Sequence, residues 1–102
     1  MQMTAIDHWE DFRAQALTEG FDEVLERVWA PNQVNATHSH PFDVEAVVAL
    51  GEMWLTHEGR TLHLTPGSTF VVASGAPHAE RYGTAGATIW AARRRSTGSA
   101  NS

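Results

Sequence analysis

Three histidines in this chain of 102 residues have the spacing of metal ligands. One serine separates His38 from His40, and His78 ends the phrase Gly75-Ala76-Pro77-His78. In a β-strand, residues two apart project from the same face, about 6–7 Å apart along the strand, so His38 and His40 can reach one ion. A third imidazole from a later strand would complete a three-nitrogen site with open coordination positions. The spacing predicts a metal centre at His38, His40 and His78.

The composition restricts both the ligands and the partners. The chain has no cysteine, so nitrogen and oxygen atoms must hold any metal. Seven basic against twelve acidic residues give a formal net charge of −5, which argues against a nucleic-acid partner because phosphate binding depends on Lys and Arg. The basic run Arg93-Arg94-Arg95 is interpreted as a solvated strand end. No apolar run approaches the ~18 residues of a membrane span, so we expect a soluble, cytoplasmic protein without membrane contact.

The N-terminal segment has the pattern of a short amphipathic helix over residues 7–19. Asp7 and Glu10 are spaced as a capping box, and Gly20 ends the periodic segment. Four apolar residues share one helical face, namely Trp9, Phe12, Ala16 and Leu17. This stripe is expected to pack on the body of the domain.

The chain from residue 21 to residue 95 predicts a β-rich barrel or sandwich, so that residues 1–95 make one domain. Eight runs are strand candidates: 22–30, 35–40, 44–50, 53–57, 61–65, 69–73, 77–82 and 87–92. Glu58-Gly59 predicts a tight hairpin, and Gly83 with Gly86 is interpreted as the last reversal. The small, polar residues 96–102 predict a disordered tail.

The run Val44–Leu50 is apolar on both faces apart from Glu45. A half-exposed antiparallel strand alternates apolar and polar residues, so something must cover the outer face of this run. The N-terminal helix or a second subunit would do so. A homodimer is therefore expected.

Two segments between Asn32 and Tyr82 resemble the conserved motifs of the cupin superfamily. The first cupin motif reads G-x5-H-x-H-x3,4-E-x6-G, and the second reads G-x5-P-x-G-x2-H-x3-N. Six positions of the chain match them: His38, His40, Gly51, Gly67, Gly75 and His78. Asn32, Ala73 and Tyr82 replace the first Gly, the Pro and the final Asn of the motifs, which is expected to alter turns rather than chemistry.

The resemblance implies a fold and a cofactor. The fold would be all-β, a small double-stranded β-helix or jelly-roll barrel with one short N-terminal helix. One divalent transition metal ion per chain would bind, namely zinc, iron, nickel, manganese or copper. Cupins of this kind include dioxygenases, isomerases, epimerases and lyases, as well as non-catalytic sensing and sugar-binding modules.

The fourth ligand of the first cupin motif, usually Glu, has no fixed counterpart here. With three residues between it and His40, the spacing that agrees with Gly51, the candidate position is Val44, which cannot bind a metal. With four residues between, it is Glu45, which would need a bulge to turn its carboxylate inward. Glu45 is therefore a conditional fourth ligand. With Glu45 as a fourth protein ligand, the ion would have no open coordination position and would be structural.

Glu80 is a second carboxylate candidate. It lies two residues after His78, so a regular strand directs both side chains to one face. A carboxylate inside a small barrel is costly unless a metal, a cation or a proton accompanies it. Glu80 is accordingly a candidate general acid or base or a hydrogen-bond partner in the pocket. An exposed Glu80 paired with Arg81 is the alternative.

Apolar side chains are expected to line the rest of the pocket. Strand alternation from Val44 predicts Ala46, Val48 and Leu50 as lining residues. The added bulk would come from Phe70, Val72, Tyr82, Trp54 or Trp90. His57 and His63 are expected on the solvent face. Such a pocket suits a small organic molecule, which leaves three hypotheses: a metal-dependent enzyme, a non-catalytic binding or sensing module, and a structural or relic metal site.

Overall fold

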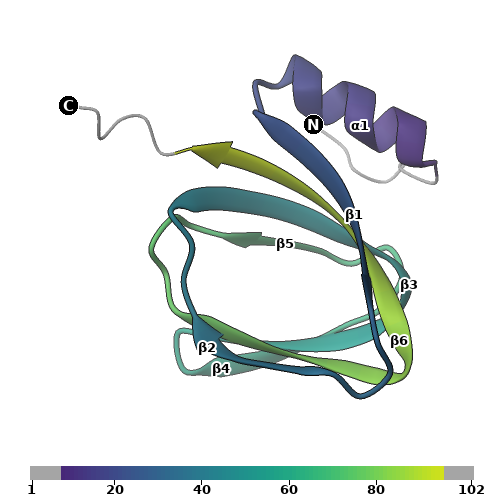
Figure 1. The fold of residues 1–102 in the computed structure, drawn as a ribbon, viewed down its shortest axis with the longest axis vertical. Helices are drawn as coiled ribbons and strands as arrows, with labels where there is room; N and C mark the ends of the chain where they lie inside the picture. The colour runs from purple at the N-terminus through teal and green to yellow at the C-terminus, as the bar shows by residue number, and fades with distance from the viewer. Residues whose placement is uncertain (1–7, 96–102) are drawn as a thin grey trace.

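The computed structural model describes residues 8–95, which form one short helix and six antiparallel strands curled into a small barrel (Figure 1). This is the predicted all-β fold with a single N-terminal helix. The elements are α1 (Trp9–Thr18), β1 (Glu23–Trp29), β2 (Val34–His38), β3 (Phe42–His57), β4 (Arg60–Leu64), β5 (Thr69–Val72) and β6 (His78–Arg95). The predicted tail at 96–102 lies outside the described residues.

Two long strands form the frame of the barrel. β3 and β6 are antiparallel partners along their whole length, and each carries two short strands on its other edge. β1 pairs with residues 87–93 of β6 and β2 with residues 78–81. β5 pairs with residues 44–47 of β3 and β4 with residues 53–57. This pairing bends one sheet around a common interior, as Figure 1 shows.

The prediction of eight strands was wrong at two glycines. The candidate strands on either side of Gly51 are one strand, β3, and those on either side of Gly86 are one strand, β6. Both glycines have positive φ, 77° and 75°, and the ladder between β3 and β6 shifts register beside them. They therefore act as bulges, which bend a strand without reversing it. The segment interpreted as a reversal at Gly83 and Gly86 is a bend of this kind.

The hairpin at Glu58-Gly59 is confirmed. Both residues have positive φ, 56° and 75°, as a two-residue primed turn requires. His57 and Arg60 pair directly across it. The hairpin therefore sets the register between β3 and β4.

Helix α1 covers the outer face of the barrel beside β1 and β6 (Figure 1). Phe12 and Ala16 are buried there in a cluster with Val47 and Trp90, whereas Leu17 is 42% exposed. The helix thus covers part of the apolar run that needed a cover. The predicted capping box was wrong, because the helix is capped by His8, whose side chain makes no capping hydrogen bond. The predicted first position of the helix, residue 7, lies outside the described residues.

A second apolar cluster lies inside the barrel. Its buried members are Ala46, Val48, Met53, Leu55, Leu64, Val72, Tyr82, Ala87 and Ile89. Four of these residues, Ala46, Val72, Tyr82 and Ile89, also line a cavity, described below. No helix among residues 8–95 is long and apolar enough to cross a membrane.

Candidate metal centre

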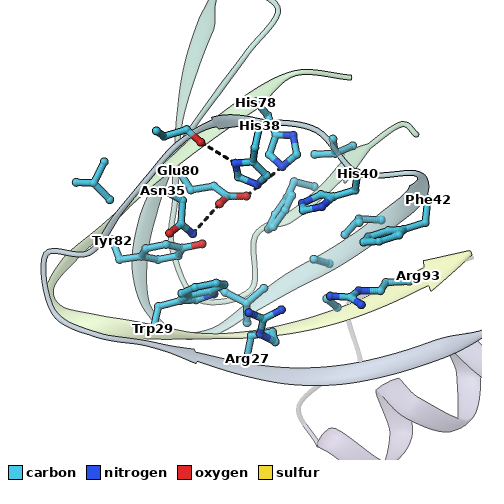
Figure 2. Close-up of a pocket in the computed structure, with 18 residues that line it drawn as sticks. Arg27, Trp29, Asn35, His38, His40, Phe42, His78, Glu80, Tyr82 and Arg93 are labelled. Carbon is cyan, nitrogen blue, oxygen red and sulfur yellow. Dashed lines mark hydrogen bonds and ion pairs between the residues drawn. The ribbon is translucent and has the colours of Figure 1, made fainter. Parts of the chain in front are cut away.

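Three imidazoles converge at one end of the cavity (Figure 2). The ring centroid of His38 lies 4.7 Å from that of His40 and 4.4 Å from that of His78, and the centroids of His40 and His78 are 5.2 Å apart. One potential ligand nitrogen from each ring lies within 4.8 Å of the other two. The structure therefore brings together the three histidines that the spacing singled out.

The strand ends determine where these rings lie. His38 is the last residue of β2 and pairs with His78, the first residue of β6. His40 lies beyond the end of β2, so the predicted strand that included both histidines is shorter than expected. The amide of Gly75 donates a hydrogen bond to the carbonyl of His40 at 2.8 Å. This bond joins the segment that carries His40 to the turn that leads to His78.

Backbone carbonyls fix the tautomer of two of the rings. The Nδ1 atom of His38 lies 2.7 Å from the carbonyl oxygen of Ala36, and that of His78 lies 3.0 Å from the carbonyl oxygen of Ala76. A carbonyl oxygen only accepts, so each Nδ1 must carry the proton and donate it. The Nε2 lone pairs of His38 and His78 are therefore available to a cation.

Glu80 places a second acceptor next to one of these lone pairs. Its Oε2 atom lies 3.3 Å from Nε2 of His78, and the two side chains are only 13% and 3% exposed. Two acceptors facing each other in a buried place repel unless a proton or a metal ion lies between them. The pair therefore has the chemistry of a cation site. Of the two placements left open for Glu80, the structure shows the one in the cavity rather than a pairing with Arg81.

A polar network extends from Glu80 along the cavity wall. The amide of Asn35 donates a hydrogen bond to Oε1 of Glu80 at 3.0 Å. Burial raises the pKa of the Tyr82 hydroxyl above its usual value, and the charge of Glu80 raises it further. Tyr82 therefore stays protonated at neutral pH, and its hydroxyl interacts with the side chains of Glu80 and Asn35 in this network.

His40 lies in a less polar environment than a free imidazole. Burial lowers its pKa, and the neighbouring His38 and His78 lower it further, as does Arg93. Its ring stacks on Phe42 with centroids 4.9 Å apart and 11° between the planes. The lowered pKa keeps His40 neutral, which is the form that binds metals.

The cavity has a volume of about 450 Å³, within the range of sites that hold small organic ligands. Of the predicted lining residues, the structure places five there: Val44, Ala46, Phe70, Val72 and Tyr82. Leu50 is instead 65% exposed, because the bulge beside it changes which residues face inward. Trp54 stacks on His63, and Trp90 packs against the helix.

Glu45 does not lie with the three imidazoles. The condition for it to act as a fourth ligand, a carboxylate turned into the cavity, is therefore not fulfilled. It lines a small hollow beneath helix α1 with Phe12 and Phe21. Its neighbours Val44 and Ala46 both line the imidazole cavity. No bulge separates Glu45 from them, so strand alternation turns its side chain to the opposite face.

Three further polar residues line the cavity although the sequence analysis placed none of them there: Arg27, Asn35 and Arg93. Arg27 and Arg93 follow strand alternation, since Trp29 and Ala91 line the same cavity, so this signal was available. Arg93 is thus no mere solvated end of a strand. Asn35 could not be found in this way, because a register shift lies between it and His38 and changes which residues face inward.

The remaining histidines of β3 and β4 do not line the cavity. His63 binds Glu52 through Nε2 at 2.7 Å and is 48% exposed, and His57 lies 3.9 Å from the carboxylate of Glu58. Both have local partners that account for them. His63 is therefore a suitable control for substitutions in the cluster.

The three imidazoles fit one transition metal ion. Nitrogens bound to one ion at about 2.1 Å lie roughly 3 to 3.5 Å apart. The rings would have to approach one another by roughly 1 to 1.5 Å, which small side-chain rotations supply. Three nitrogen donors with no sulfur suit zinc, iron, nickel, copper or, with a carboxylate, manganese.

Comparison with solved structures gives the class of the fold. The chain is similar to an RmlC-like cupin from Desulfovibrio desulfuricans (TM-score 0.59, 19% identity, covering 70% of this chain and 69% of that one). It is also similar to KdgF from Halomonas sp. (TM-score 0.62, 22% identity, covering 71% and 67%). A third similar structure comes from the DMSP lyases RdDddP and RnDddQII (TM-score 0.66, 24% identity), where the match covers 78% of this chain and 40% of that one.

The fold is therefore that of the cupin superfamily. No model of a protein family matches the sequence. No curated protein matches it either.

Proposed function

We propose that this protein is a metal-dependent cupin that binds and transforms a small organic molecule in its barrel cavity. The observation that carries the proposal is the convergence of three ring nitrogens within 4.8 Å of one another at the wall of a cavity of about 450 Å³. His38, His40 and His78 would hold one divalent ion. The fixed Nδ1–H tautomers of His38 and His78 support this role, because they direct Nε2 to the ion.

An ion held by three imidazoles would act as a Lewis acid toward an oxygen atom of the ligand. Glu80 is the group of this chain that can move a proton there, because its carboxylate lies beside the cluster and is largely buried. The hydrogen bond from Asn35 holds Oε1 of Glu80 in place. The Tyr82 hydroxyl, which stays protonated, can donate to a negative charge that develops on the ligand.

These groups favour proton-transfer chemistry, of the lyase or isomerase type, over a purely structural ion. The similarity to proteins described as DMSP lyases supports this choice. The alternative is a non-catalytic binding or sensing module. A ligand that stabilises the metal-free protein as much as the loaded protein would favour the alternative.

We also propose that the protein forms a homodimer through its outer sheet face. Val28 and Leu50 are 75% and 65% exposed, and both are direct neighbours of Thr88 across the sheet. Exposed apolar side chains in one row are typical of contact surfaces. The hollow lined by residues 47–50, Pro66, Thr88 and Trp90 adjoins this row.

The test of the metal centre is elemental analysis of purified protein from metal-replete cells. We expect about one transition metal ion per chain, lost in each of His38→Ala, His40→Ala and His78→Ala. His63→Ala is the matched control, because His63 also pairs with a carboxylate but lies outside the cavity. Metal-free wild-type protein, or metal loss in the control to the same extent, would contradict the proposal.

A further inference from the structure

Two arginines face the cavity on the side away from the imidazoles (Figure 2). Arg27 comes from β1 and Arg93 from β6, and both line the cavity. Both are half-buried. A guanidinium that loses part of its hydration needs an anion or a hydrogen-bond acceptor in return, and the proposed proton transfer makes no use of either residue.

Arg27 is held by an aromatic stack. Its Cζ atom lies 4.6 Å from the centre of the Trp29 ring, and Trp29 stacks on Tyr82 with centroids 5.1 Å apart and 13° between the planes. Stacking uses the flat face of a guanidinium and leaves its N–H edge free to donate. Among residues 8–95, no carboxylate forms an ion pair with Arg27.

Arg93 is held in the same way on the neighbouring strand, β6. Its Cζ atom lies 4.5 Å from the centre of the Phe42 ring, which in turn stacks on His40. Nη1 of Arg93 pairs with Glu23 at 3.2 Å, but Glu23 is 54% exposed and does not line the cavity. Exposed pairs of this kind are weak and readily replaced. Two arginine–aromatic stacks therefore lead from the two guanidiniums toward the imidazole end.

The charges of the cavity do not balance without a ligand. Of the described residues that line it, Glu80 is the single carboxylate; Asn35 donates to its Oε1 atom, and its Oε2 atom faces His78 at the imidazole end. Arg27 and Arg93 both contribute positive charge, and a divalent ion at the imidazoles would add more. A negatively charged ligand restores the balance.

We propose that Arg27 and Arg93 bind a carboxylate of the small molecule, so that this protein acts on an organic acid lying between the arginines and the imidazoles. A carboxylate is the partner that the planar fork of a guanidinium matches best. This inference rests on the proposed function of the cavity. The arginines determine which ligands bind, and the imidazole end performs the chemistry.

Calorimetric titration of the metal-loaded protein tests this with the dicarboxylates from malonate to adipate and the monoamide of each. The two members of a pair have the same length and differ by one charge. We expect at least one dicarboxylate to bind about tenfold more tightly than its monoamide, the size of effect that a charged hydrogen bond gives. Arg27→Gln and Arg93→Gln each remove this preference, whereas Arg27→Lys, which keeps the charge, retains part of it.

Arg81→Gln is the matched control, because Arg81 stacks on Trp54 at 4.0 Å but does not line the cavity. It should leave the preference unchanged. No preference in the wild-type protein, or an unaltered preference in both Gln variants, would overturn the inference; the wild-type comparison needs no variant to fold. Metal content, measured in parallel, separates the two proposals. A metal-free wild type refutes the metal centre. Titration of that metal-free protein still tests whether the arginines bind a carboxylate.

Discussion

The hydrogen bonds from Nδ1 of His38 and His78 to backbone carbonyls orient the two imidazole rings before any ion binds. Each carbonyl belongs to the residue two positions earlier, so each ring is oriented by its own strand end. A histidine held through Nδ1 presents Nε2 in one direction, which reduces the cost of organising a site. The sequence indicates which histidines cluster, but it does not show which nitrogen of each ring is free.

Glu80→Gln tests whether the Glu80 carboxylate lies near the ion without being one of its ligands. We expect the variant to keep one metal ion per chain, because the three imidazoles remain, and to bind it about 10–100-fold more weakly, because the negative charge beside Nε2 of His78 is lost. Glu52→Gln, which removes a similar carboxylate from His63 outside the cavity, should leave the affinity unchanged. Competition with a chromogenic chelator measures both constants. Complete loss of metal in Glu80→Gln would show that Glu80 is itself a ligand.

The lowered pKa of His40 predicts how the metal-free protein responds to acid. Below the ordinary value of 6.5 the unfolded chain takes up a proton at this residue more readily than the folded one. The free energy of unfolding should therefore fall as the pH falls from 7.5 to 5.5. His40→Asn should have a shallower dependence, as measured by urea denaturation at each pH. An equal or steeper dependence in His40→Asn would contradict the assignment.

The elements that the sequence predicts correctly are those without a bulge. The helix, the hairpin and all the β-rich segments could be recognised, because periodicity and turn residues are local signals. The joining of strands at Gly51 and Gly86 could not, because a glycine with positive φ serves a reversal and a bulge equally well. Leu50 was misplaced for the same reason. Alternation from Val44 predicts that it lines the cavity, but the bulge between Val48 and Leu50 leaves it exposed on the outer face.

The bend at Gly86 should be sensitive to a single methyl group. A Cβ there would collide with the carbonyl of Trp29, whereas a Cβ at Gly67 would meet nothing. Both glycines have positive φ, 94° at Gly67 and 75° at Gly86, so both alanine variants carry backbone strain. We expect Gly86→Ala to lower the free energy of unfolding by about 1–3 kcal/mol more than Gly67→Ala, a typical overpacking cost. Chemical denaturation measures the difference; equal effects would mean that the bend tolerates a side chain.

At the scale of the whole molecule, the interior and the outer surface of the barrel carry different groups of residues. Its interior holds the imidazoles and the arginines, and its outer face carries the helix and the exposed row at Val28 and Leu50. The apolar run on β3 indicated from sequence that a cover was needed. It did not show that the helix covers only part of that face, because this depends on where α1 packs.

The proposed homodimer predicts a mass of twice the chain's 11.2 kDa in solution. Leu50→Lys should yield a monomer, because a charge in the centre of an apolar contact is costly to bury. Val71→Lys is the control, since Val71 is 59% exposed on β5, outside the row. Light scattering during size-exclusion chromatography measures the mass. A monomeric wild type at micromolar concentration would contradict the proposal.

The metal centre itself is tested most directly by a crystal structure of the metal-loaded protein with anomalous diffraction at the absorption edge of the metal found. We expect one anomalous peak per chain, about 2.0–2.2 Å from Nε2 of His38 and of His78 and from one ring nitrogen of His40, with the remaining coordination positions facing the cavity. A peak elsewhere, or a loaded crystal in which any of the three rings does not bind the ion, would contradict it.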